Sequence, residues 1–158
     1  MAGELTITLN ETDYAYVQSK LSKLTKLEKN AVVQKGLQEG LSIIAKEGRK
    51  TLKSTLSKDS WNTHMREYMA KKRGGSLQKS IGTKTIKKKL KGYSGFKKHG
   101  HHAHLVDSGT VNRWTKNGAF RGKVAGSRFW RTAFDNKRNQ AVKELMESVR
   151  KSIQKLSK

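Results

Sequence analysis

The chain has 158 residues without cysteine or proline, and its 35 lysines and arginines against 12 acidic residues give a formal net charge of +23. The lack of cysteine excludes disulfides and thiolate metal ligands, and no apolar run approaches the roughly 20 residues that a helix needs to cross a bilayer. A surface this basic repels itself and is stabilised by an anionic neighbour, so the partner classes are nucleic acid, a membrane surface or an acidic protein.

The first predicted elements are a short strand and two helices. Residues 5–9 alternate apolar side chains with threonine, as a strand does. Asn10 or Thr12 would cap the helix that follows. A longer helix is expected over about residues 28–54, because its stripe recurs at steps of three and four: Val33, Leu37, Leu41, Ile44, Gly48 and Leu52. The N-terminus lacks the basic and apolar segments of a signal peptide, so we expect no secretory leader.

Glycines in the longer helix call for a packing reason. Gly36, Gly40 and Gly48 each cost about 1 kcal/mol relative to alanine inside a helix. Gly40 and Gly48 lie eight residues apart on one face, where they would let another backbone approach closely. Ordinary packing between helices is the favoured explanation.

The middle of the chain is predicted as short elements. We expect a short helix over 61–72, one helical turn at 76–81, a strand at 83–90 and a second strand at 102–106. Loops or turns are expected at the glycines around them, which are Gly92, Gly95, Gly100, Gly118 and Gly122.

The last helix is the clearest element. It is expected to begin at Ser127 or Arg128 and to end near Leu156, with a buried stripe of Phe134, Ala141, Leu145, Val149 and Ile153. Neither an internal repeat nor a low-complexity linker divides the chain. We therefore predict a single domain over residues 1–158.

Residues 68–106 contain no acidic side chain, although eleven lysines and arginines lie among them. Within this span, residues 84–101 are predicted to form a basic loop or hairpin that faces a partner. The basic residues assigned to that role are Lys84, Lys87, Lys88, Lys89, Lys91, Lys97 and Lys98.

Catalytic chemistry is not expected. Beyond Glu67 the carboxylates are only Asp107, Asp135, Glu144 and Glu147, which are too scattered for paired acid–base chemistry or for a magnesium site. The sequence also lacks a phosphate-binding loop, a dinucleotide-binding glycine pattern and a nucleophile elbow. We predict a protein that is not an enzyme and that uses no cofactor.

Four histidines form a group: His99, His101, His102 and His104. On a strand, His102 and His104 would share a face, and imidazoles placed in this way bind zinc, copper or nickel. Asp107 is the only further ligand nearby, and the surrounding lysines oppose a divalent cation. Solvated or interface histidines are favoured over a metal site.

Aromatic residues among the basic ones would also suit nucleic acid. Tyr93, Phe96, Trp114 and Phe120 are interleaved with lysine and arginine, as a base-stacking surface requires. The sequence nevertheless has no RNA- or DNA-recognition motif. A membrane surface is disfavoured, because the basic region lacks an amphipathic helix with bulky apolar anchors.

A corner is predicted at residues 102–110, where a strand ends in a carboxylate and a turn that requires glycine. The residues of this motif are Leu105, Val106, Asp107, Gly109 and Thr110. Asp107 is expected to accept hydrogen bonds from backbone N–H groups or to pair with Arg128 or Arg131. A simple turn cap is the alternative.

An aromatic segment opens the terminal helix at residues 127–134. Its motif residues are Arg128, Phe129, Trp130 and Ala133. We expect Phe129, Trp130 and Phe134 to lock the helix onto the sheet. Contact between Trp130 and a neighbouring subunit is the alternative.

Together with Gly-Ser-Leu-Gln-Lys-Ser-Ile81 upstream, the order of these segments resembles the tail-completion, or head-tail joining, proteins of long-tailed bacteriophages. In that family a long helix precedes a Gly-x-Leu-x-x-Ser-Ile segment. A strand ending in Val-Glu-x-Gly-Thr follows, and then Pro-Phe-x-x-x-Ala and a final helix. The resemblance covers about residues 28–156. Asp107 replaces the usual glutamate, and Ser127 and Arg128 stand where a proline commonly leads the helix.

The resemblance implies an α+β protomer, in which a long helix from the N-terminal half and a C-terminal helix pack on a small antiparallel sheet. It also implies a homo-oligomeric ring, with six subunits expected, in the virion neck. This ring would assemble in the host cytoplasm and join the head connector or adaptor to the tail tube or tail terminator, with DNA passing through and no membrane involved.

Acidic neighbouring proteins are the favoured counter-charge. Duplex DNA carries one phosphate per ~1.7 Å. If the basic side chains paired densely with these phosphates, they would hold the DNA, which must slide through the neck. A basic nucleic-acid-binding protein of the packaging or chaperone type is the alternative function.

Overall fold

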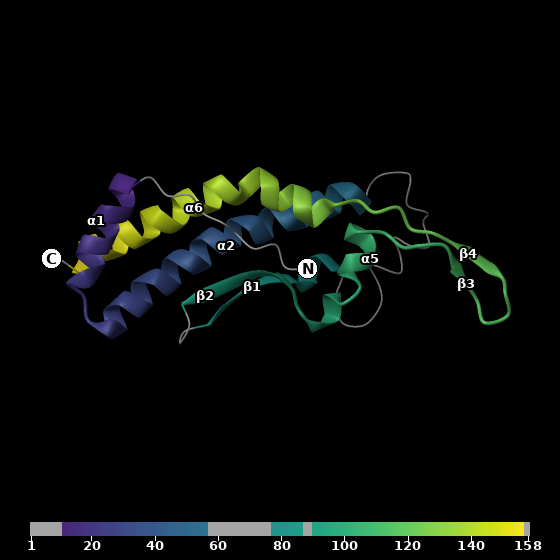
Figure 1. The fold of residues 1–158 in the computed structure, drawn as a ribbon, viewed down its shortest axis with the longest axis horizontal. Helices are drawn as coiled ribbons and strands as arrows, with labels where there is room; N and C mark the ends of the chain where they lie inside the picture. Colours follow the sequence, from purple (N-terminus) through teal and green to yellow (C-terminus); the bar gives the residue numbers. More distant parts are fainter. Residues whose placement is uncertain (1–10, 57–76, 87–89, 157–158) are drawn as a thin grey trace. The chain divides into compact units, whose positions relative to one another are not determined.

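The computed structural model describes residues 11–56, 77–86 and 90–156. The elements in chain order are helix α1 (Glu11–Ser22), α2 (Lys26–Leu56), α4 (Leu77–Ser80), strands β1 (Ile81–Ile86) and β2 (Lys91–Phe96), the 3-10 helix η2 (Lys98–Gly100), α5 (Ala103–Asp107), β3 (Arg113–Trp114), β4 (Phe120–Gly122) and α6 (Phe129–Leu156). Strand β1 pairs with β2, and β3 pairs with β4 (Figure 1). The predicted α+β class, with a small antiparallel sheet packed on long helices, is confirmed.

Contacts divide the chain into two compact units. Unit 1 comprises Met1–Ala45, Thr83–Gly95 and Lys137–Lys158, and unit 2 comprises Lys46–Gly82 and Phe96–Asn136. The helices α2 and α6 and the strands β1 and β2 each contribute residues to both units.

Helix α2 begins at a capping box. The backbone N–H and the hydroxyl of Thr25 both donate to the Glu28 carboxylate, at 2.9 and 2.7 Å, and the N–H of Glu28 donates to the Thr25 hydroxyl oxygen at 3.4 Å. These bonds to the Thr25 side chain and backbone lower the pKa of Glu28. They also satisfy N–H groups that have no partner inside the helix. The helix predicted over 28–54 is confirmed and starts slightly earlier, at Lys26.

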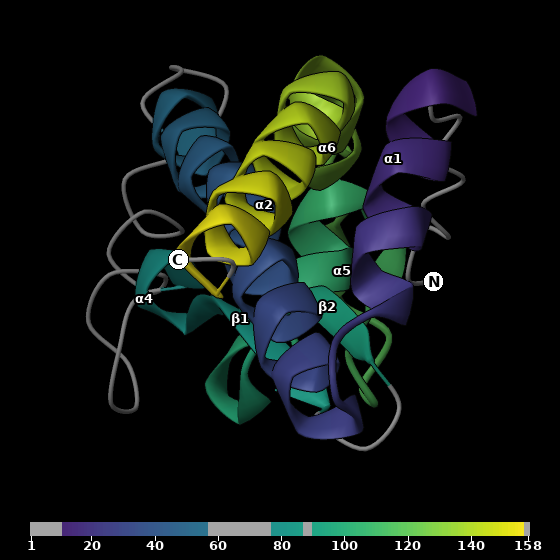
Figure 2. The same cartoon turned by 90° about the vertical axis from the view of Figure 1, so that its left-hand side faces the viewer.

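Glycines in unit 1 lie where α2 and α6 contact each other (Figure 2 shows the two helices). A Cβ atom at Gly40 would lie 2.6 Å from the carbonyl oxygen of Ala141, and one at Gly36 would lie 2.7 Å from Cγ2 of Val149. Because later residues of α2 meet earlier residues of α6, the helices are antiparallel here. The close backbone approach, which was the less favoured explanation, is found at Gly40.

The core of unit 1 lies between α1, α2 and α6. Its buried residues are Val17, Val32, Val149 and Ile153, and the partly buried residues packed on them are Leu21, Leu24, Leu145 and Met146. The burial of Val149 and Ile153, together with that of Ala141, confirms much of the stripe predicted for the last helix.

The β1–β2 hairpin contacts α2 within unit 1. The amide of Gln38 donates to the hydroxyl oxygen of Thr83 at 2.8 Å. Gly92 of β2 lies against Leu37 and Leu41 of α2, where a side chain would overlap Leu41. Gly92 and Gly95 were predicted in loops, which is wrong: both are strand residues. At Gly92 the glycine serves close packing rather than a turn.

Unit 2 has its own core, whose largest fully buried side chains are Leu52, Leu77, Ile81, Val106 and Phe129. The helical turn predicted before the first strand is confirmed as α4, which runs directly into β1. This strand covers Ile81–Ile86 instead of residues 83–90, because Ile81 belongs to the core and the strand starts there.

The strand predicted at 102–106 is wrong. Residues 101–107 form a turn and the short helix α5, in which the N–H of Leu105 donates to the carbonyl of His102 at 3.0 Å. A strand would have buried Ala103 and Leu105 together. Instead Ala103 and Val106, three residues apart, are buried and Leu105 is exposed, which is helical spacing.

Other predictions have mixed outcomes. The turn at Gly118 is confirmed by its φ of +77°, whereas Gly122 lies in β4 instead of in a turn. The strand predicted at 5–9 and the helix predicted at 61–72 lie outside the described residues.

Replacing Gly40 with alanine tests the close approach of the two helices. We expect Gly40→Ala to lower the free energy of unfolding by about 1–2 kcal/mol, because overlap with the Ala141 carbonyl outweighs the gain in helix propensity. The measurement is urea unfolding at one fixed protein concentration.

The matched control is Gly95→Ala, since a Cβ atom at Gly95 meets no atom within 4 Å. This variant should be as stable as the wild type, or more stable by about 0.5 kcal/mol. Equal stability of the Gly40→Ala variant and the wild type would contradict the account of helix contact.

Candidate functional site

The corner and the start of α6 form one joint in unit 2, which we define as residues 106–110 and 124–130. The backbone N–H and the hydroxyl of Ser127 both donate to the carbonyl oxygen of Val106, at 3.0 and 2.9 Å. The N–H of Arg128 donates to the carbonyl oxygen of Asp107 at 2.8 Å. Two motifs that are separate in the sequence are thus joined through their backbones.

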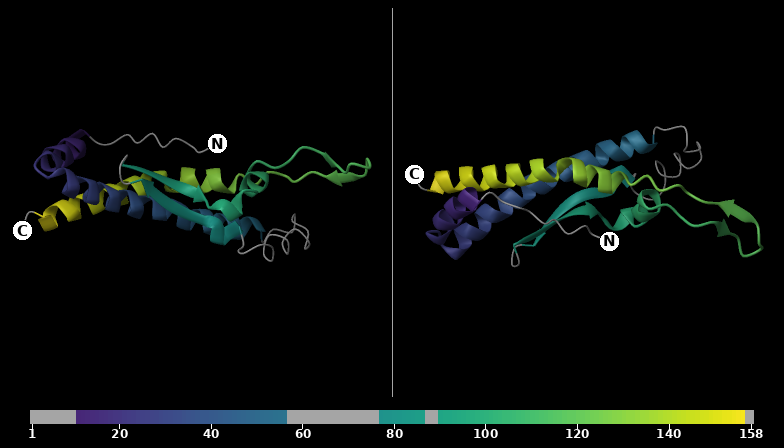
Figure 3. Two further views of the ribbon diagram at one scale, coloured as in Figure 1. Left: turned by 90° about the horizontal axis from the view of Figure 1, so that it is seen from below. Right: turned by 45° about the horizontal axis from the view of Figure 1, so that its top comes forward.

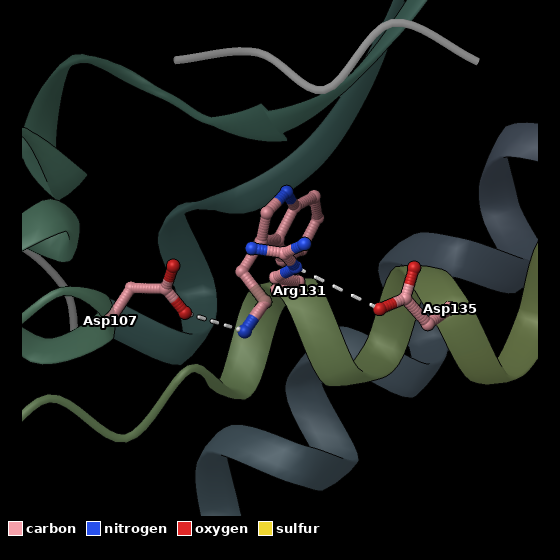
Figure 4. Close-up of polar contacts among 4 residues, drawn as sticks. Asp107, Arg131 and Asp135 are labelled. Carbon is pink, nitrogen blue, oxygen red and sulfur yellow. Dashed lines mark hydrogen bonds and ion pairs between the residues drawn. The ribbon is translucent and has the colours of Figure 1, made fainter.

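The carboxylate of Asp107 caps helix α6 from another segment of the chain. Its Oδ1 atom accepts a hydrogen bond from the backbone N–H of Trp130 at 2.8 Å (Figure 4). The first N–H groups of a helix have no internal partner and carry partial positive charge, so a carboxylate stabilises them. Of the roles predicted for Asp107, acceptance from the backbone is confirmed. Arg131 pairs instead with Asp135, at 4.0 Å (Figure 4).

Gly109 is required at the joint for two reasons. Its φ is +81°, a conformation that residues with a side chain adopt at a cost. A Cβ atom there would also lie 2.6 Å from the backbone nitrogen of Gly126. The predicted need for glycine in this corner is confirmed.

The threonine that follows Gly109 continues the joint. The Thr110 N–H donates to the carbonyl oxygen of Val124, and the Val124 N–H donates to the Thr110 hydroxyl, both at 2.9 Å. Gly109 and Ala125 form an isolated antiparallel bridge beside this pair. The two segments are therefore held in register on both sides of the corner.

Arg128 carries strain at the start of α6. Its φ is +52°, and among the described residues only Leu90 shares a positive φ without being glycine. The left-handed conformation costs a residue with a Cβ atom about 1–2 kcal/mol. The hydrogen bond of its N–H to Asp107 and the cap on Trp130 hold the backbone there, so the joint fixes the direction in which α6 starts.

The aromatic residues at the start of α6 pack on the end of β2. Phe129 is fully buried and meets the ring of Phe96 edge-on, at 5.9 Å between centroids. Trp130 lies 5.0 Å from the same ring and also covers Gly48 of α2. The prediction that Phe129 and Trp130 lock the last helix onto the sheet is confirmed. At Gly48 the close neighbour is an indole ring rather than a backbone. Ala133, one turn later, is fully buried.

The histidines do not form a strand face, because their segment is a turn followed by α5. The rings of His101 and His102 meet edge-on at 5.2 Å. Burial lowers the pKa of His102, and the neighbouring charges of His101 and His104 add to this shift. Within the described ranges, no three histidine or acidic side chains are placed to hold a metal ion.

The basic residues predicted to face a partner are solvent-exposed where the structure describes them. Lys84 and Lys91 are exposed on the strands in unit 1, and Lys97 and Lys98 are exposed in unit 2. Residues 87–89, which hold three further lysines of this set, lie outside the described residues.

The predicted stacking surface of four aromatic residues is not formed as one set. Phe96 is engaged by Phe129 and Trp130. Trp114 and Phe120 instead lie against each other on the β3–β4 hairpin, with ring centroids 4.8 Å apart. The sequence signal for this pair was its placement three residues before and three residues after Asn117 in the turn, which puts the two side chains opposite each other across the strands.

No helix in the described part of the chain is long and apolar enough to cross a membrane. The chain matches no protein-family model, no curated protein and no solved structure. The case for a function therefore comes from the joint, the charge and the exposed hairpin.

Removing the carboxylate of Asp107 tests the cap on α6. We expect Asp107→Ala to lower the free energy of unfolding by about 1–2 kcal/mol, because the Trp130 N–H loses its acceptor. The Asp107→Asn variant keeps an acceptor oxygen, so its free energy of unfolding should fall by less than that of Asp107→Ala. Thermal or urea unfolding measures both.

The control is Asp135→Ala, which also removes one negative charge, but from an exposed ion pair within α6. Its expected effect is within about 0.5 kcal/mol, because exposed ion pairs contribute little. Equal losses in the Asp107→Ala and Asp135→Ala variants would show that charge, and not the cap, matters.

The lowered pKa of His102 predicts a dependence of stability on pH. Below the unfolded pKa of about 6.5, the unfolded chain binds more protons at this position than the folded chain does. The contribution of neutral His102 to the free energy of unfolding is therefore complete above about pH 6.5, and it is lost as the pH falls through the pKa of His102 in the folded protein. We expect unfolding midpoints to decline less between about pH 7 and 5 in His102→Asn than in the wild type. An equal decline of the unfolding midpoint in both proteins would contradict a lowered pKa of His102 in the folded state.

Proposed function

We propose that this chain is a structural subunit of a long-tailed bacteriophage, forming a ring at the neck that joins the head connector to the tail tube and lets DNA pass. The observation that carries the proposal is the joint between residues 106–110 and 124–130. The two short motifs behind the resemblance to head-tail joining proteins meet there, and Val106, Asp107 and Thr110 of the first motif form hydrogen bonds with the segment that leads into α6.

The roles at the joint are architectural. Asp107 caps a helix, Gly109 permits a close backbone crossing, and Ser127 ties the two segments together. The joint carboxylate is engaged with a backbone N–H instead of facing another carboxylate or a nucleophile. This use of a polar group favours a rigid building block over a catalyst.

The charge of the chain supports assembly with acidic proteins. A formal charge of +23 on 158 residues repels further copies of itself unless neighbours supply negative charge. A ring of such subunits would gain that charge from acidic rings above and below it. The alternative function, a packaging or chaperone protein that binds nucleic acid, accounts for the charge but gives no reason for the joint.

A nonsense mutation in the gene for this chain, in the phage that encodes it, tests the proposal. We expect DNA-filled heads and complete tails to accumulate unjoined in the lysate, as counted by electron microscopy. Adding the purified protein should join them.

Two results would contradict the proposal. Normal virions from the mutant would exclude a role at the neck. Empty heads beside intact tails would point to packaging, and thus to the alternative function.

A further inference from the structure

An aromatic pair stands exposed on the β3–β4 hairpin of unit 2. Trp114 is 62% exposed and Phe120 is 57% exposed, although the two rings touch at a tilt of 56°. The hairpin lies at the end of a two-stranded arm that leaves the joint (Figure 3). Large side chains in such a position lose solvent-exposed apolar area only when a partner covers them.

The turn of the hairpin is well defined. The N–H of Thr115 donates to the carbonyl of Ala119 at 2.8 Å, and its hydroxyl accepts the N–H of Ala119 at 2.9 Å. Gly118 adopts a φ of +77° in open space. The aromatic pair is therefore presented on an ordered ribbon, which reduces the entropy lost when it binds.

The charges around the pair all have one sign. Residues 108–134 contain no acidic side chain. The basic side chains on and beside the hairpin, all of them exposed, are Arg113, Lys116, Arg121 and Lys123. A complementary surface is thus apolar at its centre and acidic at its rim.

We propose that the β3–β4 hairpin docks in an apolar, acid-rimmed pocket on a different protein of the assembly, with Trp114 and Phe120 as its anchor. Tryptophan and arginine are enriched among the residues that dominate binding energy, and such residues act when fully desolvated inside a pocket. The surrounding lysines and arginines select the acidic rim and speed association. This inference rests on the proposed function, since it assigns one contact of the neck to one element.

The geometry of the pair favours a protein pocket over nucleic acid. Bases stack on aromatic rings that are presented in succession along a strand. Trp114 and Phe120 instead lie against each other at a tilt of 56°, so they form one compact pair rather than two successive platforms. Copies in the proposed ring, each with a charge of +23, already need acidic neighbours, so an acidic protein is favoured over a second copy as the occupant.

The test complements the nonsense mutant with altered full-length chains. One variant, Trp114→Ser with Phe120→Ser, removes the anchor. A second, Lys116→Glu with Arg121→Glu, keeps the aromatic pair and inverts the charge. The matched controls are Tyr93→Ser, an aromatic residue 49% exposed on β2, and Lys46→Glu, an exposed lysine on α2.

We expect the wild-type chain and both controls to restore joined particles, and both hairpin variants to lower their number by about tenfold or more. Native mass spectrometry should give each hairpin variant the oligomeric state of the wild type. Suppressors of the charge variant should change aspartate or glutamate to lysine or arginine in another virion protein.

The outcomes separate the inference from the proposed function. If the wild-type chain fails to restore joining, the proposed function is wrong, and this inference falls with it. If the wild type succeeds and the hairpin variants join particles equally well, the inference alone is wrong. Suppressors confined to the chain's own gene would assign the hairpin to a second copy. Weaker binding of the anchor variant to a labelled 20-nucleotide single strand, with joining intact, would assign it to nucleic acid.

Discussion

The hydrogen bond from the Trp130 backbone to the Asp107 carboxylate, with the backbone bonds around it, is the contact on which unit 2 depends. It fixes where α6 begins, and so it directs Phe129 and Trp130 onto Phe96 and Gly48. It also closes the base of the arm that carries the β3–β4 hairpin. The bonds of this joint therefore set both the aromatic core of unit 2 and the place from which the exposed pair projects.

Close backbone contact compensates for a chain with few apolar residues. Gly40 lets α2 approach the Ala141 backbone, and Gly109 lets the corner cross Gly126. In both places the missing side chain brings main chains to a distance that no larger residue allows. Dispersion between the main chains then replaces part of the buried side-chain area. Lysine and arginine are left free to cover the surface.

The sequence predicted the elements in which the spacing of apolar residues repeats over many turns. Helices α2 and α6 were predicted from apolar steps of three and four, and the roles of Asp107 and Gly109 followed from their chemistry. Short segments were harder, because the spacing of Ala103, Leu105 and Val106 fits a strand or a helical turn equally well. Tertiary burial of Ala103 and Val106 decides for the helix. Gly92 was predicted as a loop residue because its need for space comes from Leu41, a partner distant in sequence. The capping box of Thr25 and Glu28 was visible in the sequence and would have placed the start of α2 correctly.

The joint gives unit 2 an ordered framework in a chain of this charge. Under our proposal, the charge is the reason why that framework needs neighbours. Under our proposal those neighbours are acidic proteins of the neck, held largely by electrostatic attraction. The most direct measurement is sedimentation of joined particles at rising salt, since the Debye length shrinks to about 3 Å at about 1 M. The account predicts that heads and tails separate steeply before that concentration is reached. Particles that stay joined at about 1 M salt would contradict it.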